Sequence, residues 1–341
     1  MKAVLLNGIN NLQMGDITEQ PLGPTEVRVK VAYSGICGSD PHIVDGNLGA
    51  ASTYPIIMGH EMSGTIVELG EKAKIRGLKV GDRVTGSPSY YCGTCDMCRN
   101  GKENFCEQFI AHIPPGTMAE TLVWDEQQIY KLPDEISMEE GALAEPVAAA
   151  LRGIERAEVA PGKSVCICGL GVIGLLQVQL ARLAGASKIM AVDVVDSKLE
   201  LAKQFGADLC VNSKEEDILD AAMEFTDDVG FDCVIEATGV PAVAEEAFNL
   251  VARGGTVNFF AVYPMDYFFP MHLATSYFKE LTVRSTFFYP YLFIKAVNLL
   301  PRLQLKPLIS KIFPLDQGVE AFEAHKDKEN IKILIQSNPV E

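Results

Sequence analysis

The sequence lacks the features that would tie it to nucleic acid or to a membrane. Its 29 Lys and Arg residues are outnumbered by 45 Asp and Glu residues, for a formal net charge of −16, and no basic run is long enough to follow a phosphate backbone. Residues 1–7 become polar too early for a signal peptide, and the most apolar run, residues 165–176, falls short of the roughly 20 residues of a membrane helix. We therefore expect a cytoplasmic protein that binds neither nucleic acid nor membranes.

The length and texture of the chain predict two domains of different class. At 341 residues the chain is too long for one ordinary core, and its 48% hydrophobic and 22% charged residues are typical of a globular protein. Residues 1–149 contain short strand-like runs separated by Gly and Pro. Residues 150–288 alternate apolar strands with amphipathic helices, as in a parallel sheet covered on both faces. We predict an α/β fold with a β-rich domain followed by a doubly wound domain.

The strand predictions are specific enough to compare with a structure. In the β-rich part they cover residues 27–31, 63–67, 81–84 and 119–123. In the doubly wound part they cover residues 164–168, 188–193, 208–211, 232–237, 255–261 and 281–285. Near the end of the chain, residues 309–313 form a further segment and residues 317–325 a helix.

Four of the nine cysteines crowd into one short stretch. In a chain without an export signal, cysteines are read as metal ligands or buried small side chains before disulfides. The spacing Cys-x2-Cys-x2-Cys-x7-Cys places four soft ligands in one lobe, and four thiolates close the coordination sphere of zinc. Such a site is structural and could stabilise its lobe by roughly 10 kcal/mol. The alternative interpretation is that the four cysteines are scattered buried side chains without a metal ion. The predicted structural zinc ligands are Cys92, Cys95, Cys98 and Cys106.

A GxGxxG motif follows the predicted strand at residues 164–168 and opens an apolar helix. Its glycines let the backbone turn tightly and approach a pyrophosphate, whose charge is met by the helix N-terminus. Asp193 ends the next predicted strand, where a carboxylate can bind both adenine-ribose hydroxyls and repel a 2′-phosphate. This favours NAD(H) over NADP(H), with Lys198 either near the ribose or a solvated helix charge. The motif residues predicted to contact the cofactor are Gly169, Gly171, Val172, Ile173 and Gly174.

A dispersed set of residues could form a second, open zinc site. Cys37, His60, Glu61 and Glu145 supply one thiolate, one imidazole and two carboxylates. Three protein ligands leave a fourth position for water or an alcohol, and zinc lowers the pKa of bound water to about 7. An alcohol deprotonated in this way becomes a hydride donor. Taken singly, Cys37 or His60 is more often a core residue, so this site depends on its context.

Together these motifs resemble the medium-chain, zinc-containing dehydrogenase/reductase family, and most closely its sorbitol and threonine dehydrogenase branch. The resemblance spans the whole chain, and its most specific part is GHE-x2-G-x5-G at residues 59–70, which is similar to the family's zinc signature. It implies that residues 1–149 form a GroES-like β-barrel catalytic domain completed by residues 289–341, and that residues 150–288 form a Rossmann dinucleotide-binding domain. It also implies two zinc ions per subunit, NAD(H), a small-molecule alcohol or ketone as substrate, and a homo-oligomer, either tetramer or dimer.

The resemblance also implies roles for the zinc-site residues. Cys37, His60 and Glu61 match the residues that bind the catalytic zinc in this branch. Glu145 stands where liver-type alcohol dehydrogenases have a cysteine. Two arrangements stay open: Glu61 and Glu145 exchange as zinc ligands, or Glu145 binds the zinc-bound water.

A proton relay and two further cofactor contacts follow from the same resemblance. Ser39 matches the family hydroxyl that takes the alcohol proton, and His42 matches the imidazole that passes it to solvent through the nicotinamide ribose. Thr238 and Phe287 stand at positions that the resemblance assigns to the cofactor. We therefore expect all four residues at the active site.

The substrate prediction starts from two departures. Sorbitol-type members carry Tyr at the position of Ile43 and Arg at that of Phe288, and both hold polyol hydroxyls; here both positions are apolar. The segment of residues 259–293 is rich in aromatic residues, which either line a pocket or pack in the core or a subunit interface. With Phe109 as a third pocket residue, the sequence predicts a bulky apolar secondary alcohol or ketone, such as a steroid or terpenoid.

Two alternatives to that substrate prediction stay open. The first keeps the polyol or threonine substrate of the nearest relatives. The second is a dinucleotide-binding protein without turnover, which predicts the loss of a catalytic zinc ligand. Because all four ligand candidates of the open site are present, the sequence favours an enzyme.

Overall fold

The chain folds into two compact units. The first contains residues 1–148 and 290–341, and the second contains residues 149–289. The second unit therefore extends one residue further at each end than the domain expected over residues 150–288. The computed structural model describes residues 1–47, 53–74, 76–111 and 116–340.

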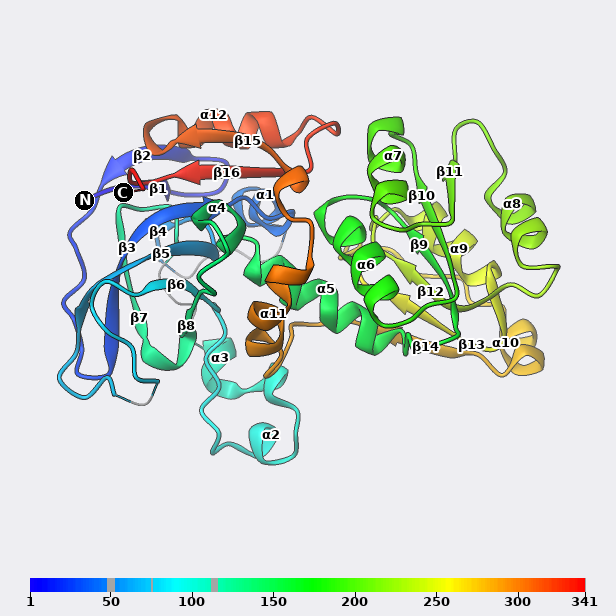
Figure 1. Cartoon of the computed structure of the whole chain (residues 1–341), viewed down its shortest axis with the longest axis horizontal. Coiled ribbons are helices and arrows are strands. Elements are labelled where there is room, and N and C mark those ends of the chain that lie inside the picture. Colours follow the sequence, from blue (N-terminus) through cyan, green and yellow to red (C-terminus); the bar gives the residue numbers. More distant parts are fainter. Residues whose placement is uncertain (48–52, 75, 112–115, 341) are drawn as a thin grey trace. The chain divides into compact units, whose positions relative to one another are not determined.

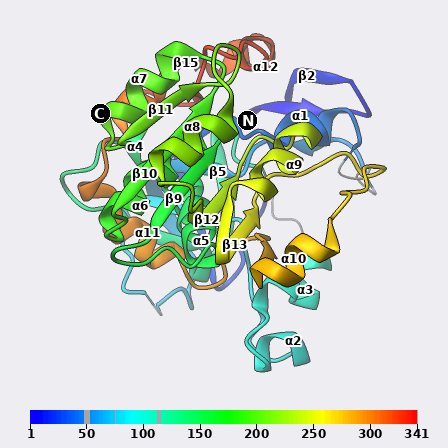
Figure 2. The same cartoon turned by 90° about the vertical axis from the view of Figure 1, so that its right-hand side faces the viewer.

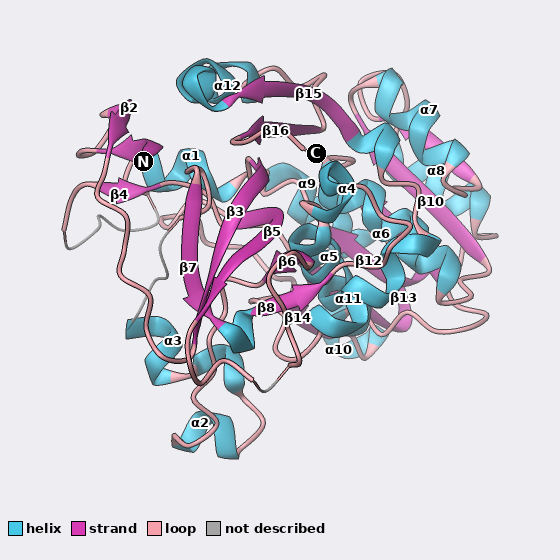
Figure 3. Ribbon diagram, turned by 60° about the vertical axis from the view of Figure 1, so that its left-hand side comes forward, coloured by secondary structure: helices cyan, strands magenta, loops and turns pink. Residues whose placement is uncertain are grey.

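The first unit is built on β-sheets. A seven-stranded sheet has the order β15-β16-β3-β5-β6-β8, with β7 pairing with β3, and a three-stranded sheet has the order β2-β1-β4 (Figure 1). The strands β3, β5 and β7 lie side by side (Figure 3). The strand bounds are β1 (Lys2–Leu6), β2 (Leu12–Asp16), β3 (Glu26–Gly35), β4 (Ile56–Ile57), β5 (Glu61–Leu69), β6 (Arg83–Gly86), β7 (Thr121–Asp125), β8 (Ile129–Lys131), β15 (Ile309–Pro314) and β16 (Lys332–Gln336).

The alternating sequence of β3 explains its place in this sheet. Val27, Val29 and Val31 are fully buried, whereas Arg28 and Lys30 between them are only half-buried. Because successive side chains of a strand point to opposite faces, the valines all face one core, where Trp124 of β7 also lies. The C-terminal end of β3 is buried without interruption, which brings the residues that follow it into the interior.

Helices and short turns complete the first unit. Ser137 and Glu140 form a capping box at the start of α4, and α5 follows after two residues and continues into the second unit. The helices are α1 (Ser39–Val44), α2 (Asp96–Arg99), α3 (Glu107–Ala111), α4 (Met138–Gly141), α5 (Ala144–Arg156), α11 (Phe293–Leu299) and α12 (Gly318–His325), with 3-10 turns at Glu103–Phe105, Glu126–Gln128, Leu300–Arg302, Lys306–Leu308 and Leu315–Gln317.

The second unit is a parallel six-stranded sheet with the order β11-β10-β9-β12-β13-β14. The chain passes from β9 outward to β10 and β11 on one side, and later from β12 to β14 on the other, so the strand order reverses between β9 and β12. In open sheets of this kind, ligands bind at the carboxyl ends of the strands beside such a reversal. The strands are β9 (Ser164–Cys168), β10 (Lys188–Asp193), β11 (Leu209–Asn212), β12 (Phe231–Glu236), β13 (Val251–Phe259) and β14 (Thr282–Ser285).

Helices pack against these strands (Figure 2). The core between them is apolar and includes the fully buried Phe231, Val234 and Val257. Among the described residues, no helix has the length and apolar character needed to cross a membrane. The helices of this unit are α6 (Val172–Leu183), α7 (Asp196–Gln204), α8 (Ile218–Phe225), α9 (Pro241–Asn249) and α10 (Leu273–Lys279).

Candidate active site

The four clustered cysteines converge in the lobe that contains α2, which we call the four-cysteine lobe (residues 92–106; Figure 1). The Sγ atoms of Cys92 and Cys106 are 3.6 Å apart, and those of the pairs Cys92–Cys98 and Cys95–Cys106 are 4.0 Å apart. Tetrahedral zinc with Zn–S bonds of about 2.3 Å requires sulfurs roughly 3.8 Å apart. The spacing of the sulfurs therefore fits one zinc ion.

Hydrogen bonds prepare one sulfur of the lobe for a cation. The hydroxyl and the backbone N–H of Thr94 both donate to Sγ of Cys92, each at 3.5 Å, and the N–H of Cys95 donates to it at 3.4 Å. These bonds lower the pKa of Cys92 to about 6, so this sulfur offers a thiolate near neutral pH. Because four protein ligands leave no open position, a zinc ion here would support the fold and would have no position open to a substrate.

The second cluster joins residues that are distant in sequence. Cys37 follows β3, and His60 and Glu61 lie at the start of β5, whose Glu61 is paired with Gly35 in the β3–β5 register. The ligand atoms of Cys37, His60 and Glu61 all lie within 4.8 Å of one another. Gly35 is needed for this approach, since a Cβ there would lie 1.8 Å from Oε2 of Glu61. One thiolate, one imidazole and one carboxylate fit zinc with an open fourth position.

A buried carboxylate orients the histidine of this cluster. Asp40 is fully buried in α1; its Oδ2 accepts a hydrogen bond from the N–H of Cys37 at 2.8 Å, and its Oδ1 lies 3.4 Å from Nδ1 of His60. Burial by itself would lower the pKa of His60, but the charges of Asp40 and Cys37 raise it well above its usual value. With Nδ1 facing Asp40, Nε2 is left for a metal ion.

A buried lysine holds the glutamate. Nζ of Lys332 lies 2.8 and 2.7 Å from the two carboxylate oxygens of Glu61 and also donates to the carbonyl of Ile36 at 2.9 Å. Both side chains are about 1% exposed. Burial lowers the pKa of Lys332, but the neighbouring charge of Glu61 outweighs it and raises the pKa. The lysine therefore supplies one positive charge beside the anionic ligands.

Asp40 and Lys332 are parts of the site that were not predicted from the sequence. For Lys332 a signal was present, because it is a charged residue directly before the apolar residues Ile333–Ile335 of β16. For Asp40 the sequence signal was only its position three residues after Cys37.

The remaining predicted residues of this site also lie in the first unit, but outside the cluster of Cys37, His60 and Glu61. Glu145 is buried in the first turn of α5, and its charge contributes to the raised pKa of Lys332, but it is outside the group whose ligand atoms lie within 4.8 Å. Ser39 and His42 are three residues apart on α1; Ser39 is half-buried, and His42 is exposed with Nδ1 3.8 Å from Oδ2 of Asp45.

The glycine motif of the second unit joins β9 to α6, as the GxGxxG pattern predicts. Gly169 has a φ of +97°, and a Cβ there would lie 2.6 Å from Cγ2 of Thr238. A Cβ at Gly174 would lie 1.8 Å from the carbonyl oxygen of Gly169. Gly171 caps α6, whose first turn contains Val172 and Ile173 and has its N–H groups free to meet a pyrophosphate.

Asp193 lies beside this loop at the end of β10. Its Oδ2 accepts a hydrogen bond from the N–H of Leu170 at 2.6 Å, and its Oδ1 accepts one from the N–H of Val194 at 2.7 Å. The carboxylate is thereby held at the carboxyl edge of the sheet. Lys198 of α7 is 7% exposed, which excludes a solvated helix charge. Phe287 follows β14, is half-exposed, and contacts Phe288 edge-on with 4.5 Å between ring centroids.

The three residues expected at the substrate have packing partners of their own. Ile43 packs against the apolar cluster that contains Ile36 and Met58. Phe109 contacts Tyr91 edge-on with 5.7 Å between ring centroids. Ile43 and Phe109 belong to the first unit and Phe288 to the second.

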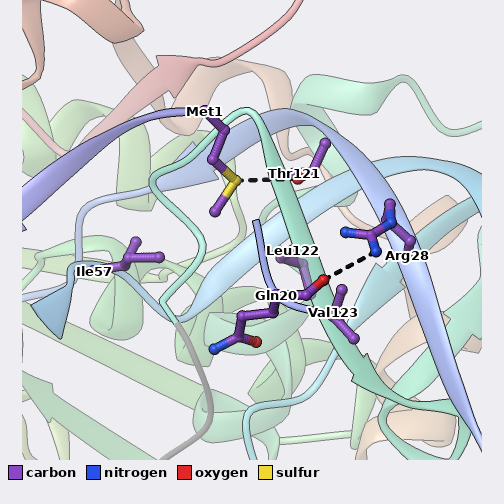
Figure 4. Close-up of a pocket in the computed structure, with 7 residues that line it drawn as sticks. All are labelled: Met1, Gln20, Arg28, Ile57, Thr121, Leu122 and Val123. Atoms are coloured by element: carbon purple, nitrogen blue, oxygen red, sulfur yellow. Dashed lines mark hydrogen bonds between the residues drawn. The ribbon is translucent and has the colours of Figure 1, made fainter. Parts of the chain in front are cut away.

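A small hollow elsewhere in the first unit offers no competing site (Figure 4). Its volume of about 10 Å³ is room for no more than one water molecule. Oγ1 of Thr121 donates to Sδ of Met1 at 3.1 Å across it. The hollow is lined by Met1, Gln20, Arg28, Ile57, Thr121, Leu122 and Val123.

Comparison with known proteins agrees with this arrangement. Residues 23–134 match the family Alcohol dehydrogenase GroES-like domain, and residues 172–302 match the family Zinc-binding dehydrogenase. The chain is 36% identical to a probable D-xylulose reductase A of Neosartorya fischeri, over 97% of this chain and 95% of that protein. It is 32% identical to a sorbitol dehydrogenase of Gallus gallus, over 99% of this chain and 97% of that protein.

Solved structures show the same fold. A zinc-binding dehydrogenase of Sinorhizobium meliloti bound to NADP matches with a TM-score of 0.93 and 32% identity, over 98% of this chain and 99% of that one. The GroES-like and Rossmann domains expected from the sequence are thus confirmed, as are zinc and a nicotinamide dinucleotide as cofactors of the family. The chain is therefore a member of the zinc-containing medium-chain alcohol dehydrogenase family, in its sorbitol dehydrogenase-like branch, and an oxidoreductase that acts on CH–OH groups.

Proposed function

We propose that this chain interconverts a polyol and the corresponding ketose by hydride transfer with NAD(H). The observation that carries the proposal is the cluster of Cys37, His60 and Glu61 with Asp40 and Lys332 behind it, in a chain that matches polyol-acting relatives over nearly its whole length. The expectation of a bulky apolar substrate finds no support among those relatives. The packing of Ile43 against the core and of Phe288 against Phe287 accounts for both apolar residues without such a substrate.

The residues of the first unit would have different roles in such a reaction. Zinc held by Cys37, His60 and Glu61 would act as a Lewis acid on the alcohol oxygen. Asp40 keeps His60 turned with Nε2 toward the ligand position, and Lys332 keeps Glu61 in place. Ser39 takes the hydroxyl proton, and His42 releases it to solvent. The exposure of His42 and its position one turn after Ser39 on α1 support this relay.

A substrate panel tests the polyol proposal. We expect kcat/KM for sorbitol or xylitol, followed by NADH formation, to exceed that for threonine and for a steroid alcohol by about tenfold or more, a difference of roughly 1.4 kcal/mol in transition-state binding. The reverse reaction with D-xylulose is the matched control. Higher efficiency with the steroid alcohol would support a bulky apolar substrate instead, and higher efficiency with threonine would support threonine as the substrate.

The preference for NAD(H) over NADP(H) is a second part of this proposal. Its support is Asp193, whose carboxylate is held at the end of β10 beside the glycine loop. A 2′-phosphate there would meet a fixed negative charge. The Sinorhizobium meliloti relative is bound to NADP, so the two cofactors must be compared directly by kcat/KM. Equal kcat/KM with the two cofactors would show that Asp193 does not face the adenine ribose.

We also propose a homo-oligomer that is joined through the second unit. The strand β14 ends the sheet, with no partner on its outer edge among the described residues. Exposed apolar side chains lie on α10 and in the segment before it. An exposed apolar surface and a free strand edge each favour self-association. Light scattering during gel filtration measures the mass; a monomer at micromolar concentration would contradict this proposal. The side chains are Met265, Phe268, Leu273, Tyr277 and Phe278.

A further inference from the structure

A fully buried carboxylate lies at the carboxyl end of β12. Glu236 is 0% exposed, and its Oε1 accepts hydrogen bonds from the backbone N–H of Thr238 at 2.6 Å and from the Thr238 hydroxyl. Its Oε2 accepts hydrogen bonds from the N–H of Gly239 at 3.3 Å and from the hydroxyl of Tyr263. Four donors satisfy a buried carboxylate whose burial would otherwise be costly. Glu236 therefore ties together the β12–α9 turn and the chain that follows β13.

The position of Glu236 relative to the glycine loop is defined within the second unit. β12 pairs with β9, and Glu236 is opposite Cys168, the last residue before Gly169. A Cβ at Gly169 would lie only 2.6 Å from Cγ2 of Thr238. The turn that Glu236 holds is thus in direct contact with the loop that receives the pyrophosphate.

The strand order decides which half of the dinucleotide this turn meets. The crevice runs across the reversal between β9 and β12. Asp193, at the end of β10, lies on the side that binds the adenine ribose. The other half of the dinucleotide, which contains the nicotinamide, must then lie over the ends of β12 and β13, where Glu236, Thr238 and Tyr263 are found.

Tyr263 lies in the chain that follows β13 and is held there by aromatic contacts and by its hydrogen bond to Glu236. Its ring contacts Phe259 edge-on and stacks on Tyr267, each with 6.1 Å between ring centroids. Burial and then the hydrogen bond to Glu236 raise the pKa of Tyr263, so its hydroxyl remains a donor throughout the neutral range. Tyr267 makes a similar contact at the surface, where its hydroxyl donates to Oε1 of Glu245 in α9 at 3.1 Å.

We propose that Glu236 and Tyr263 are positioning residues for the nicotinamide half of the cofactor. Glu236 fixes Thr238 against the glycine loop, and Tyr263 fixes the chain after β13 to the same carboxylate. The β12–α9 turn and the chain after β13, which lie on either side of the nicotinamide position, are thereby held together by one carboxylate. The proposal depends on the binding of a dinucleotide to this unit and not on the identity of the alcohol.

Tyr263→Phe tests the proposal because it removes one hydroxyl and keeps the ring. We expect the Kd for NADH, measured by titration of its fluorescence with zinc-loaded protein, to rise roughly tenfold, as for the loss of one hydrogen bond to a buried charged group. ADP-ribose shares the adenosine and pyrophosphate but lacks the nicotinamide. Its Kd, measured by calorimetry, should change less than twofold. A merely structural defect in the unit would weaken both ligands together.

Two further variants complete the experiment. Tyr267→Phe removes the matched surface hydrogen bond and should leave both dissociation constants unchanged. Glu236→Gln should weaken NADH binding more than Tyr263→Phe does, because its NH2 group cannot accept from two of the four donors and the other two lose a charged acceptor. If this variant does not fold, Tyr263→Phe alone decides. Wild-type NADH affinity in Tyr263→Phe, or equal losses of NADH and ADP-ribose, would overturn the proposal. These titrations contain no alcohol, so their outcome is independent of the polyol assay.

Discussion

The two metal sites of the first unit are built in opposite ways. All four ligands of the four-cysteine lobe lie between residues 92 and 106, and backbone N–H groups of the same stretch donate to Cys92. In the cluster around Cys37, the glutamate and the lysine that holds it are 271 positions apart in the chain. A local site needs only its own short stretch, whereas a dispersed site exists only after β3, β5 and β16 have paired.

The groups that surround the ligands also differ between the two sites. The lobe offers sulfur ligands that are supported by peptide N–H groups. The dispersed cluster has two fully buried charges behind its ligands, Asp40 and Lys332. Buried charges are costly unless they are paired, so their presence indicates a site whose ligands must be held in defined orientations. The comparison predicts that damage to the lobe affects stability, and damage to the cluster affects turnover.

The largest effect should follow from Cys37→Ser. Loss of the thiolate removes a ligand from the open site but leaves the sheet pairing unchanged, so kcat should fall roughly 10⁴-fold, or about 5–6 kcal/mol in activation free energy. Turnover, metal content and thermal unfolding are measured on the same preparation. Substantial activity with a full complement of zinc would show that Cys37 is not a catalytic ligand.

Cys95→Ser should produce the reverse pattern. The lobe loses one of its four ligands, and of the roughly 10 kcal/mol that such a site can contribute, a loss on the order of 5 kcal/mol is expected. One zinc per chain should disappear, and proteolysis should begin in residues 92–106. If Cys95→Ser lost turnover but kept its protease resistance, the assignment of a structural role to the four-cysteine lobe would be wrong.

Lys332→Met tests the charge behind the cluster. Without the ammonium group, the carboxylate of Glu61 is buried and unpaired, which should cost about 3–5 kcal/mol in the unfolding free energy of the metal-free protein. Zinc should restore part of this loss, since the ion supplies the missing positive charge. Lys326→Met is the matched control, because Lys326 pairs with Glu323 at the surface and should contribute less than about 1 kcal/mol. Equal effects of the two substitutions would mean that the buried pair does not stabilise the site.

Asp40→Asn should have the smallest effect of the four. The amide keeps the size of the side chain but weakens its hold on Nδ1 of His60, so zinc affinity or kcat should fall about 10–100-fold. Competition with a chelator measures the affinity. If neither quantity changes, the orientation of His60 is set by packing and not by Asp40.

The strand predictions were most accurate in the second unit. β9 and β10 have the predicted bounds, and β12 and β14 differ from prediction by one residue at one or both ends. β13 begins at Val251, four residues before the predicted start, because Phe231 of β12 pairs with Val251 across an irregularity in the register. Buried parallel strands are continuous apolar runs, which are visible in the sequence, whereas an irregular register depends on the neighbouring strand.

In the first unit the predicted strands correspond to β3, β5, β6 and β7 of the large sheet. The prediction missed β8 and β16 of that sheet, and the small sheet of β1, β2 and β4. The predicted residues 27–31 and 63–67 lie inside β3 and β5. β4 is only two residues long and exists through its pairing with β1. A strand of that length has no periodicity of its own, so only its partner can define it.

The sequence by itself determined the chemistry that local spacing can encode: the sulfur ligands of the lobe, the glycine loop with Asp193, and the His60–Glu61 pair. Only the tertiary structure decided that Lys332 neutralises Glu61, that Asp40 faces His60, and that Glu236 binds Tyr263 beside the glycine loop. The physical reason is that a buried charge needs its partner within a few ångströms in space, and the pairing of distant strands alone sets that distance.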